Sequence, residues 1–274
     1  MPLENPPLES SRAARLLASA AVAALLALSV AGCKTTSDDV TGSIGSSAPR
    51  SDAEWRRSLE VYGARYRANP DDAEAAIAYA RGLRATDQRA QAVAVLEQAS
   101  IRNSSNMTLL GAYGRALAEA GDLNQAFDVL TRAHTPDNPD WRVLNAQGAV
   151  LDQLGRHAEA QKYYSSALKI VPDEPSVLSN LGLSYVLMKD LKRAEVTLRR
   201  AIAQPNADPK VRQNLALVVG LRGKFDEAEK IAREGVPASE AAANVEYLRE
   251  MLAQQKDWKK KGGRAFVPQP NPGG

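Results

Sequence analysis

Few side chains in this sequence could do acid, base, nucleophilic or metal chemistry. The 274 residues include two histidines, His134 and His157, and one cysteine, Cys33. Neither histidine has a second histidine or a cysteine at the spacing of metal ligands, and no nucleophile is flanked by a base in a recognisable motif. His157 falls in a predicted turn, and His134 is expected at a helix end, where its ring can meet exposed carbonyl groups. We therefore predict a protein that is not an enzyme and uses no metal or cofactor.

Cys33 follows an apolar segment near the N-terminus. Two arginines precede a charge-free run, 16–32, made mostly of Leu, Ala and Val, which is the layout of a secretory signal peptide. The run is about 17 residues long, at the lower edge of what spans a bilayer, so we expect it to be cleaved. Its end, Val30-Ala31-Gly32-Cys33, resembles the lipobox of bacterial lipoproteins, with Val30 in place of the usual Leu. The resemblance implies that residues 1–32 are removed and that the Cys33 thiol is lipidated.

The residues after Cys33 indicate a destination and a tether. In lipoproteins of bacteria with two membranes, an Asp after the cysteine retains the protein at the inner membrane, whereas this chain has Lys34. The resemblance therefore implies the periplasmic face of the outer membrane, with a lipid anchor. Ser, Thr and Gly dominate the segment that follows, and such a composition buries too little apolar surface to fold. We expect a disordered tether over 33–50 and, for the same reason, a disordered tail over 260–274.

Small residues repeat along the rest of the chain with a fixed period of 34. The period is carried by Ala92, Ala126, Ala160, Ala194 and Ala228. Such a period is the signature of a repeat architecture, and the large apolar residues between these alanines recur at helical spacing. Each unit is therefore predicted to be a pair of antiparallel helices. The register places five units without insertion or deletion, starting at residues 73, 107, 141, 175 and 209.

The third unit carries the clearest family pattern. Its residues at the diagnostic places are Leu144, Gly148, Leu151, Ala160, Tyr164, Ala167 and Pro172. They resemble the tetratricopeptide repeat, which implies an all-α solenoid of five helix-turn-helix units. The eighth place of every unit is small, where the paired helices should cross closely. It is occupied by Ala80, Gly114, Gly148, Gly182 and Ala216.

Turns and ends can also be predicted. The turn between paired helices holds Gly121, Gly155 or Gly223 in three units, whereas units one and four have Asp87-Gln88 and Lys189-Asp190. The fifth unit is the most degraded, and Gly235-Val236-Pro237 should end its second helix early. An apolar stripe over 51–69 predicts an N-terminal capping helix, and a second helix should run from Ser239 to about residue 258. The solenoid is thus expected over 51–259.

The family resemblance also implies a binding groove lined by the first helix of each unit. The predicted lining is polar and partly basic at one end and apolar at the other, and the apolar end would suit an amphipathic helix or an apolar peptide end. The C-terminal helix could instead fold back over part of that end. Only Asn180 and Lys210 match the carboxylate-clamp subtype of the family, so this chain is not expected to bind acidic chain ends in that way. The candidate groove residues are Arg81, Arg84, Arg115, Asn145, Asp152, Ser179, Leu183, Val186, Leu187, Gln213, Leu217 and Leu221.

The balance of charges and the combination of segments favour a protein partner. A net charge of +3 from 35 basic and 32 acidic interleaved residues is too balanced to predict nucleic-acid binding, and no small-molecule substrate is expected. The lipobox, the tether and the five units together resemble the TadD-type lipoproteins of the tight-adherence pilus system. That resemblance implies a pilotin-like accessory factor that engages a secretin or another assembly component. The alternative is a general envelope scaffold that recruits peptidoglycan enzymes or assists outer-membrane protein assembly.

Overall fold

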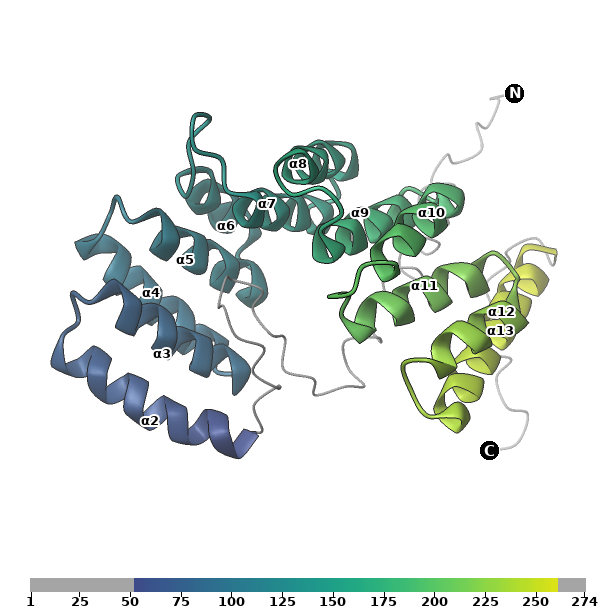
Figure 1. Ribbon diagram of the computed structural model, residues 1–274, viewed down its shortest axis with the longest axis horizontal. Helices are drawn as coiled ribbons and strands as arrows, with labels where there is room; N and C mark the ends of the chain where they lie inside the picture. The colour runs from purple at the N-terminus through teal and green to yellow at the C-terminus, as the bar shows by residue number, and fades with distance from the viewer. Residues whose placement is uncertain (1–51, 261–274) are drawn as a thin grey trace, which may run out of the picture. The chain divides into compact units, whose positions relative to one another are not determined.

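The computed structural model describes residues 52–260, so the predictions for the signal peptide, Cys33, the tether and residues 261–274 lie outside the described residues. Within 52–260 every regular element is an α-helix, and an isolated bridge joins Thr135 to Asn138. The helices are shown in Figure 1 and are α2 (Asp52–Ala68), α3 (Ala73–Ala85), α4 (Arg89–Arg102), α5 (Met107–Ala120), α6 (Leu123–Thr131), α7 (Trp141–Gln153), α8 (His157–Ile170), α9 (Pro175–Leu187), α10 (Leu191–Ile202), α11 (Pro209–Leu221), α12 (Phe225–Arg233) and α13 (Ala238–Lys260). The described residues form two compact bodies, 52–214 and 215–260.

The first body is a run of helical hairpins that follows the predicted register. The first helices of the five units begin at Ala73, Met107, Trp141, Pro175 and Pro209, the residues at which the 34-residue period places the unit starts. From α2 to α10, each helix packs against its neighbour in the chain. The expected N-terminal capping helix is α2, and the expected C-terminal one is α13. The prediction of an all-α solenoid with a capping helix at each end is confirmed.

A polar residue before each first helix explains why these helices begin where they do. Asp72 Oδ1 accepts a hydrogen bond from the Ala75 N–H at 3.0 Å, and Asn106 Oδ1 accepts one from the Leu109 N–H at 3.0 Å. Asp140 and Glu174 cap α7 and α9 in the same way. A capping side chain satisfies a backbone donor that the helix itself leaves unpaired. This series repeats every 34 residues, so it was visible in the sequence as a second signal of the unit starts.

The turns inside the hairpins adopt the left-handed backbone conformation. Gly121 and Gly155 have φ values of 94° and 76°, as their positions after α5 and α7 predict. Asp87 and Lys189 take the same role in units one and four, with φ values of 61° and 62°. A lysine has no local means of relieving the steric clash of this conformation, so Lys189 holds a strained turn.

The two helices of a hairpin touch where the small eighth residue lies. A Cβ atom added to Gly148 would lie 2.5 Å from Tyr164 Cε1, and one added to Gly114 would lie 2.5 Å from Leu130 Cγ. At Gly182 the distance to Leu198 Cγ would be 2.7 Å. No real side chain fits at these distances, so the predicted close crossing is confirmed.

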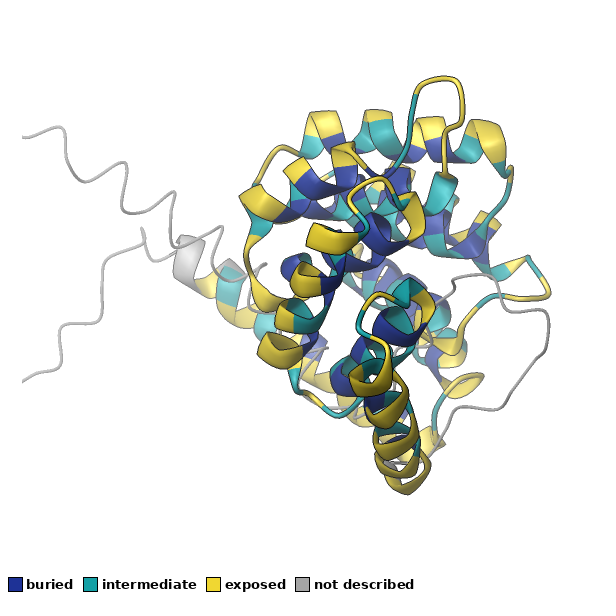
Figure 2. Cartoon of the chain, turned by 90° about the vertical axis from the view of Figure 1, so that its left-hand side faces the viewer, coloured by how far each residue is buried: buried dark blue, intermediate teal, exposed yellow. Residues whose placement is uncertain are grey.

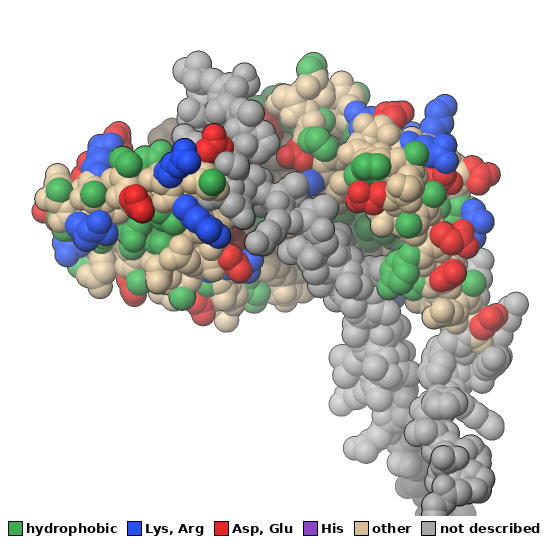
Figure 3. Space-filling view, turned by 90° about the horizontal axis from the view of Figure 1, so that it is seen from below, with side chains coloured by type: hydrophobic (Ala, Val, Ile, Leu, Met, Phe, Trp, Pro, Cys, Tyr) green, Lys and Arg blue, Asp and Glu red, His purple; other side chains and the backbone are tan. Residues whose placement is uncertain are grey.

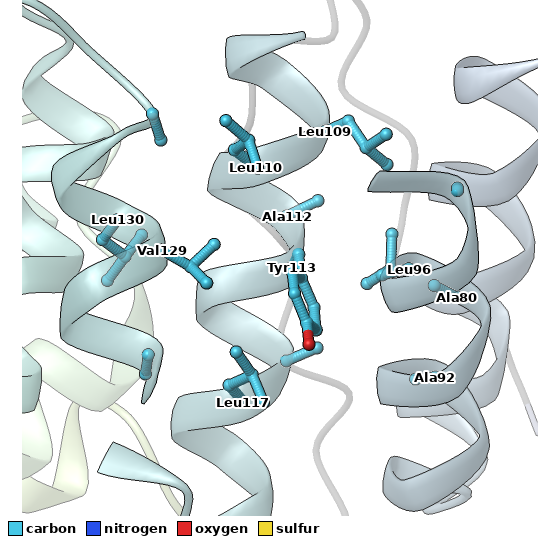
Figure 4. Packing of buried hydrophobic residues seen from close by; sticks show 14 of the residues in the cluster. Ala80, Ala92, Leu96, Leu109, Leu110, Ala112, Tyr113, Leu117, Val129 and Leu130 are labelled. Atoms are coloured by element: carbon cyan, nitrogen blue, oxygen red, sulfur yellow. The ribbon is translucent and has the colours of Figure 1, made fainter. Parts of the chain in front are cut away.

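The core is continuous from hairpin to hairpin and is built on the inward stripe of each helix. Figure 4 shows α5 between its neighbours, with Tyr113 lying toward Leu96 on one side and Leu110 lying toward the helix that carries Val129 on the other. The alanines of the 34-residue period are fully buried, and Figure 2 shows the buried stripes facing inward and the exposed ones facing solvent. The helices are therefore held mainly by apolar contact at close approach.

The second body comprises the rest of α11 from Leu215, with α12 and α13. Helix α12 ends at Arg233, ahead of Gly235-Val236-Pro237, as predicted. Ala216, Ala232 and Ala241 bring the three helices together in one apolar cluster. None of the helices in 52–260 is both long enough and apolar enough to cross a bilayer.

Candidate partner-binding surface

In the first body, one side is formed by the first helices of the hairpins. Helix α3 contacts α5, α5 contacts α7 and α7 contacts α9, in addition to the contacts within the hairpins. We call the side lined by these four helices the inner face. The fifth, ninth, twelfth and thirteenth places of a unit fall on one stripe of a helix. The candidate residues of this body that the sequence predicts are Arg81 and Arg84 on α3, Arg115 on α5, Asn145 and Asp152 on α7, Ser179, Leu183, Val186 and Leu187 on α9, and Gln213 on α11.

Hydrogen bonds between residues 35 positions apart link successive first helices across the inner face. Arg84 Nε donates to Glu119 Oε2 at 2.7 Å, and Arg84 Nη2 donates to the other carboxylate oxygen. Asn180 Nδ2 donates to Asn145 Oδ1 at 3.0 Å, and the Asn214 amide donates to Ser179 Oγ at 3.1 Å. Arg84, Asn145 and Ser179 therefore help to hold the helices together.

Asp152 is the centre of a polar network. Its carboxylate accepts hydrogen bonds from Tyr164 Oη and from Ser184 Oγ, each at 2.9 Å, and lies 2.9 Å from His157 Nδ1. The Asp152 side chain is only 10% exposed, and Tyr164 and Ser184 are buried. Burial, followed by the neighbouring charge of Asp152, raises the pKa of the Tyr164 phenol far above its usual value. Asp152 thus joins α7, α8 and α9.

Residues at the twelfth place of the units are packed, which differs from the expectation of an open lining. The side chain of Arg84 is 13% exposed, and Val186 is 3% exposed. Arg84 reaches α5 through Glu119, Asp152 reaches α9 through Ser184, and a Cβ atom added to Gly220 would meet Leu248 of α13. The physical reason is that this place faces the following helix of the stack and not the solvent.

The apolar part of the inner face in this body is smaller than predicted. Leu183 and Leu187 are half-buried on α9, and Met188, which follows them, is 49% exposed. Ser179 is buried together with Val186. Only Leu183 and Leu187 among the four predicted residues of α9 therefore remain accessible to a partner.

Three candidate residues lie on α11: Gln213 belongs to the first body, and Leu217 and Leu221 belong to the second. Gln213 is exposed on α11, and Leu217 and Leu221 are half-buried further along the same helix. The sequence left open whether the C-terminal helix covers part of the apolar end. The contact between Gly220 and Leu248 shows that α13 covers α11 at that point.

The two histidines belong to structural networks. The sequence predicts His134 at a helix end. Helix α6 ends at Thr131, however, so His134 lies in the connection that follows. Its Nε2 lies 3.0 Å from Gln147 Oε1, and the Gln147 amide donates to Thr131 Oγ1. Gln147 is 1% exposed, so this network anchors the connection in the core.

The network around His157 does not have the geometry of a nucleophilic triad. Ser184 Oγ donates to the carboxylate of Asp152 and not to the ring of His157, whereas a serine nucleophile needs the histidine as its direct base. Within the described residues, no group of three or more His, Cys, Asp and Glu side chains could hold a metal ion.

Charge is mixed over the described surface. Figure 3 shows Lys and Arg side chains interspersed with Asp and Glu side chains, with hydrophobic side chains between them. Arg156 pairs with Glu159 and Arg193 with Asp190 at the starts of the second helices α8 and α10. The surface visible in that view has no extended patch of one sign, which a nucleic-acid binder would present.

Comparison with known proteins shows the nature of the repeats. Two segments, 77–140 and 153–218, match models of the tetratricopeptide repeat. No curated protein sequence matches the chain. Among solved structures, the chain is similar to PilW, a widely conserved type IV pilus biogenesis factor, with 15% identity, a TM-score of 0.61, and coverage of 70% of this chain and 91% of that one.

Two further structures show the same similarity. PilF of Pseudomonas aeruginosa has 16% identity and a TM-score of 0.56, covering 71% of this chain and 90% of that one. A chain of the APC/C hetero-tetramer Cut9-Hcn1 has 17% identity and a TM-score of 0.62, and the match covers 74% of this chain but only 40% of that one. At such low sequence identity, the structural similarity to these three proteins establishes a shared fold and nothing beyond it.

Proposed function

The chain folds as a tetratricopeptide-repeat solenoid, an architecture that generally serves as a scaffold for protein interactions, and we propose that it is an outer-membrane-anchored accessory factor for pilus assembly. In this proposal Cys33 carries the lipid anchor at the periplasmic face of the outer membrane. The solenoid engages a secretin or another assembly component in the manner of a pilotin, as in the TadD-type lipoproteins of the tight-adherence system.

Two lines support the pilus assignment. The sequence combines a lipobox-like end at Cys33 with tetratricopeptide repeats, and two of the structures with a similar fold are a type IV pilus biogenesis factor and PilF of Pseudomonas aeruginosa. Two or three acyl chains would hold such a protein durably on a membrane, since each buried CH₂ contributes about 0.8 kcal/mol.

The observation that carries the binding function is the inner face of the first body. Its first helices are fixed to one another by packing and by the Arg84–Glu119 and Asn145–Asn180 contacts, so the face is rigid before a partner arrives. Leu183 and Leu187 leave apolar surface accessible at one end. A rigid surface loses little conformational entropy on binding, which favours recognition of a peptide segment or helix.

The test places a photo-crosslinking amino acid at Met188, which is 49% exposed beside these leucines, in cells that assemble the pilus. The double variant Leu183→Asp with Leu187→Asp should abolish the crosslinked product while the helical circular dichroism is kept. Val196→Asp is the matched control, because Val196 is 64% exposed on the second helix α10. Identical crosslinking in the double variant would place the site elsewhere.

The anchor is tested separately. Cys33→Ser should move the protein from outer-membrane fractions to the soluble periplasmic fraction, and continued sedimentation with membranes would refute lipidation at this residue. Mass spectrometry of the crosslinked partner then decides between the two candidate roles. A secretin or pilus component supports the proposal, and a peptidoglycan enzyme contradicts it.

A further inference from the structure

The turn between α9 and α10 contains a strained lysine. Lys189 has a φ of 62°, at the place where three other units have Gly121, Gly155 and Gly223. Asp87 holds this place in unit one, and a short polar side chain of that kind can form local hydrogen bonds that lysine cannot form. Glycine would suit the turn better, so the fold itself gives no reason for a lysine here. Strain of this kind is typical of residues that are kept for a function.

The positive charge of this turn is not neutralised within it. Lys189 and Lys192 are both exposed, and neither side chain forms an ion pair within residues 52–260. The carboxylate of Asp190 lies between them in the sequence, but it accepts hydrogen bonds from the Arg193 N–H and from Arg193 Nε. Residues 188–193 therefore carry three cations and one carboxylate, and that carboxylate is already bound.

Two carboxylates of the helices that pack together here are also committed. Glu195 on α10 has a side chain that is 7% exposed, and it binds Arg199 through Oε1. Asp152 on α7 is 10% exposed and accepts hydrogen bonds from Tyr164 and Ser184. The turn therefore keeps a local positive charge, although charge is mixed over the surface as a whole.

The apolar end of the inner face leads to this turn. Leu183 and Leu187 lie one helical turn apart on α9, and Leu187 is the last residue of the helix. Met188 follows and is 49% exposed. Consecutive Cα atoms are about 3.8 Å apart, so the Cα atom of Lys189 lies within about 8 Å of that of Leu187. A partner segment that covers these leucines along α9 therefore comes within reach of the Lys189 ammonium.

We infer that Lys189 and Lys192 bind side-chain carboxylates of the partner segment whose apolar residues cover Leu183 and Leu187. The inference rests on the proposed function, since it names the chemistry of the segment that the inner face holds. An ammonium group has three donors on a flexible stem, so it can meet an Asp or Glu side chain in many orientations. Exposed charge pairs contribute modestly to affinity and more to the choice of partner. The two lysines thus select acidic segments from among apolar ones.

The test uses the purified full-length protein in detergent and a library of random peptides displayed at the N-terminus of a phage coat protein. In this format the peptide C-terminus is joined to the coat protein, so only Asp and Glu side chains can supply carboxylates. Peptides selected by the wild type should have Asp or Glu close to large apolar residues. A selected peptide, labelled with a fluorophore, then measures the affinity of each variant by anisotropy.

Stability and affinity should change in opposite directions in Lys189→Gly. Glycine adopts the conformation of this turn without strain, so the urea midpoint should rise. The loss of the charge should weaken peptide binding by about two- to fivefold. Lys189→Arg keeps the charge and should bind like the wild type. A residue that served only the turn would not lower the affinity while the stability rises.

A second variant keeps a long side chain at both places. Lys189→Gln with Lys192→Gln should weaken binding of the selected peptide by about three- to tenfold and remove the acidic enrichment from a new selection. Raising the salt concentration should weaken binding to the wild type and have little effect on this variant. Circular dichroism shows whether each variant is folded.

Two matched controls carry the same changes elsewhere. Lys162→Gln with Lys169→Gln removes two exposed lysines of the second helix α8 and should leave selection and affinity unchanged. Asp87→Gly makes the glycine replacement at the same place of unit one and should also leave the affinity unchanged.

The outcomes separate this inference from the proposed function. Selected peptides without acidic enrichment, or equal binding by the Lys189→Gln, Lys192→Gln variant, would overturn the inference and leave the inner face standing as a binding surface. Failure of the Leu183→Asp, Leu187→Asp variant to weaken peptide binding would count against the inner face itself. Acidic enrichment that depends on Lys189 and Lys192 and disappears in high salt supports the inference.

Discussion

Ser184 on α9 donates a 2.9 Å hydrogen bond to Asp152 on α7, and this contact joins the fourth repeat to the third through a buried carboxylate. Tyr164 donates to the second oxygen of the same group. One side chain therefore couples the last turn of α7 to the second helix of the same hairpin and to the next unit. The stability of a repeat protein is approximately the sum of the stabilities of its units and of the interfaces between them. This contact therefore stabilises the interface between the third and fourth units.

Removal of that carboxylate should destabilise the solenoid more than removal of one donor. We expect Asp152→Ala to lower the free energy of unfolding by about 2–4 kcal/mol, because the hydroxyls of Tyr164 and Ser184 would be left buried without an acceptor. Ser184→Ala should lower it by about 1 kcal/mol. Urea unfolding followed by circular dichroism measures both, and equal losses would contradict a central role for Asp152.

Two glycines of the first helices should respond oppositely to the same substitution. Gly148→Ala would place a Cβ atom 2.5 Å from the ring of Tyr164, so we expect a loss of about 1–3 kcal/mol. At Gly111 the nearest atoms would be 3.5 Å away, an ordinary contact, so Gly111→Ala should raise the free energy of unfolding by about 0.5–1 kcal/mol. Thermal denaturation of the two variants checks the signs. If both variants were destabilised, the space around Gly111 on α5 would be too small for a methyl group.

The strained turn at Lys189 provides a third prediction. Its φ of 62° suits glycine, so Lys189→Gly should stabilise the chain by up to about 1 kcal/mol after the greater freedom of the unfolded glycine is included. Lys162→Gly is the matched control, because Lys162 lies inside α8 and should cost about 0.5–1 kcal/mol. If the urea midpoint of Lys189→Gly lay at a lower concentration than that of the wild type, the backbone at Lys189 would not be strained.

The sequence could predict the features that depend on periodicity and local chemistry. The unit starts at Ala73 and Met107 and the turn glycine Gly155 follow from spacing alone, because each repeat encodes its own hairpin. The roles of Asp152 and Val186 could not be predicted in this way. Their burial depends on how closely one first helix approaches the next, and that approach is set by the stacking of whole units and not by residues within one unit.

Acidic pH should weaken the helix caps, which provides the last prediction. The Ala75 N–H and then the Arg65 side chain hold the pKa of Asp72 below its usual value of 3.8, and the Arg193 N–H and side chain do the same for the pKa of Asp190. A carboxylate whose pKa is lower in the folded state stabilises it at pH values above the unfolded pKa. That stabilisation is lost as the pH falls through the folded pKa. The thermal midpoint of the wild type should therefore decrease when the pH is lowered below about 4.

Asn also caps helices, so the Asp72→Asn, Asp190→Asn variant should fold at neutral pH. Its thermal midpoint should decrease less than that of the wild type between about pH 5 and pH 3. An acid-induced decrease equal to that of the wild type would show that other carboxylates dominate.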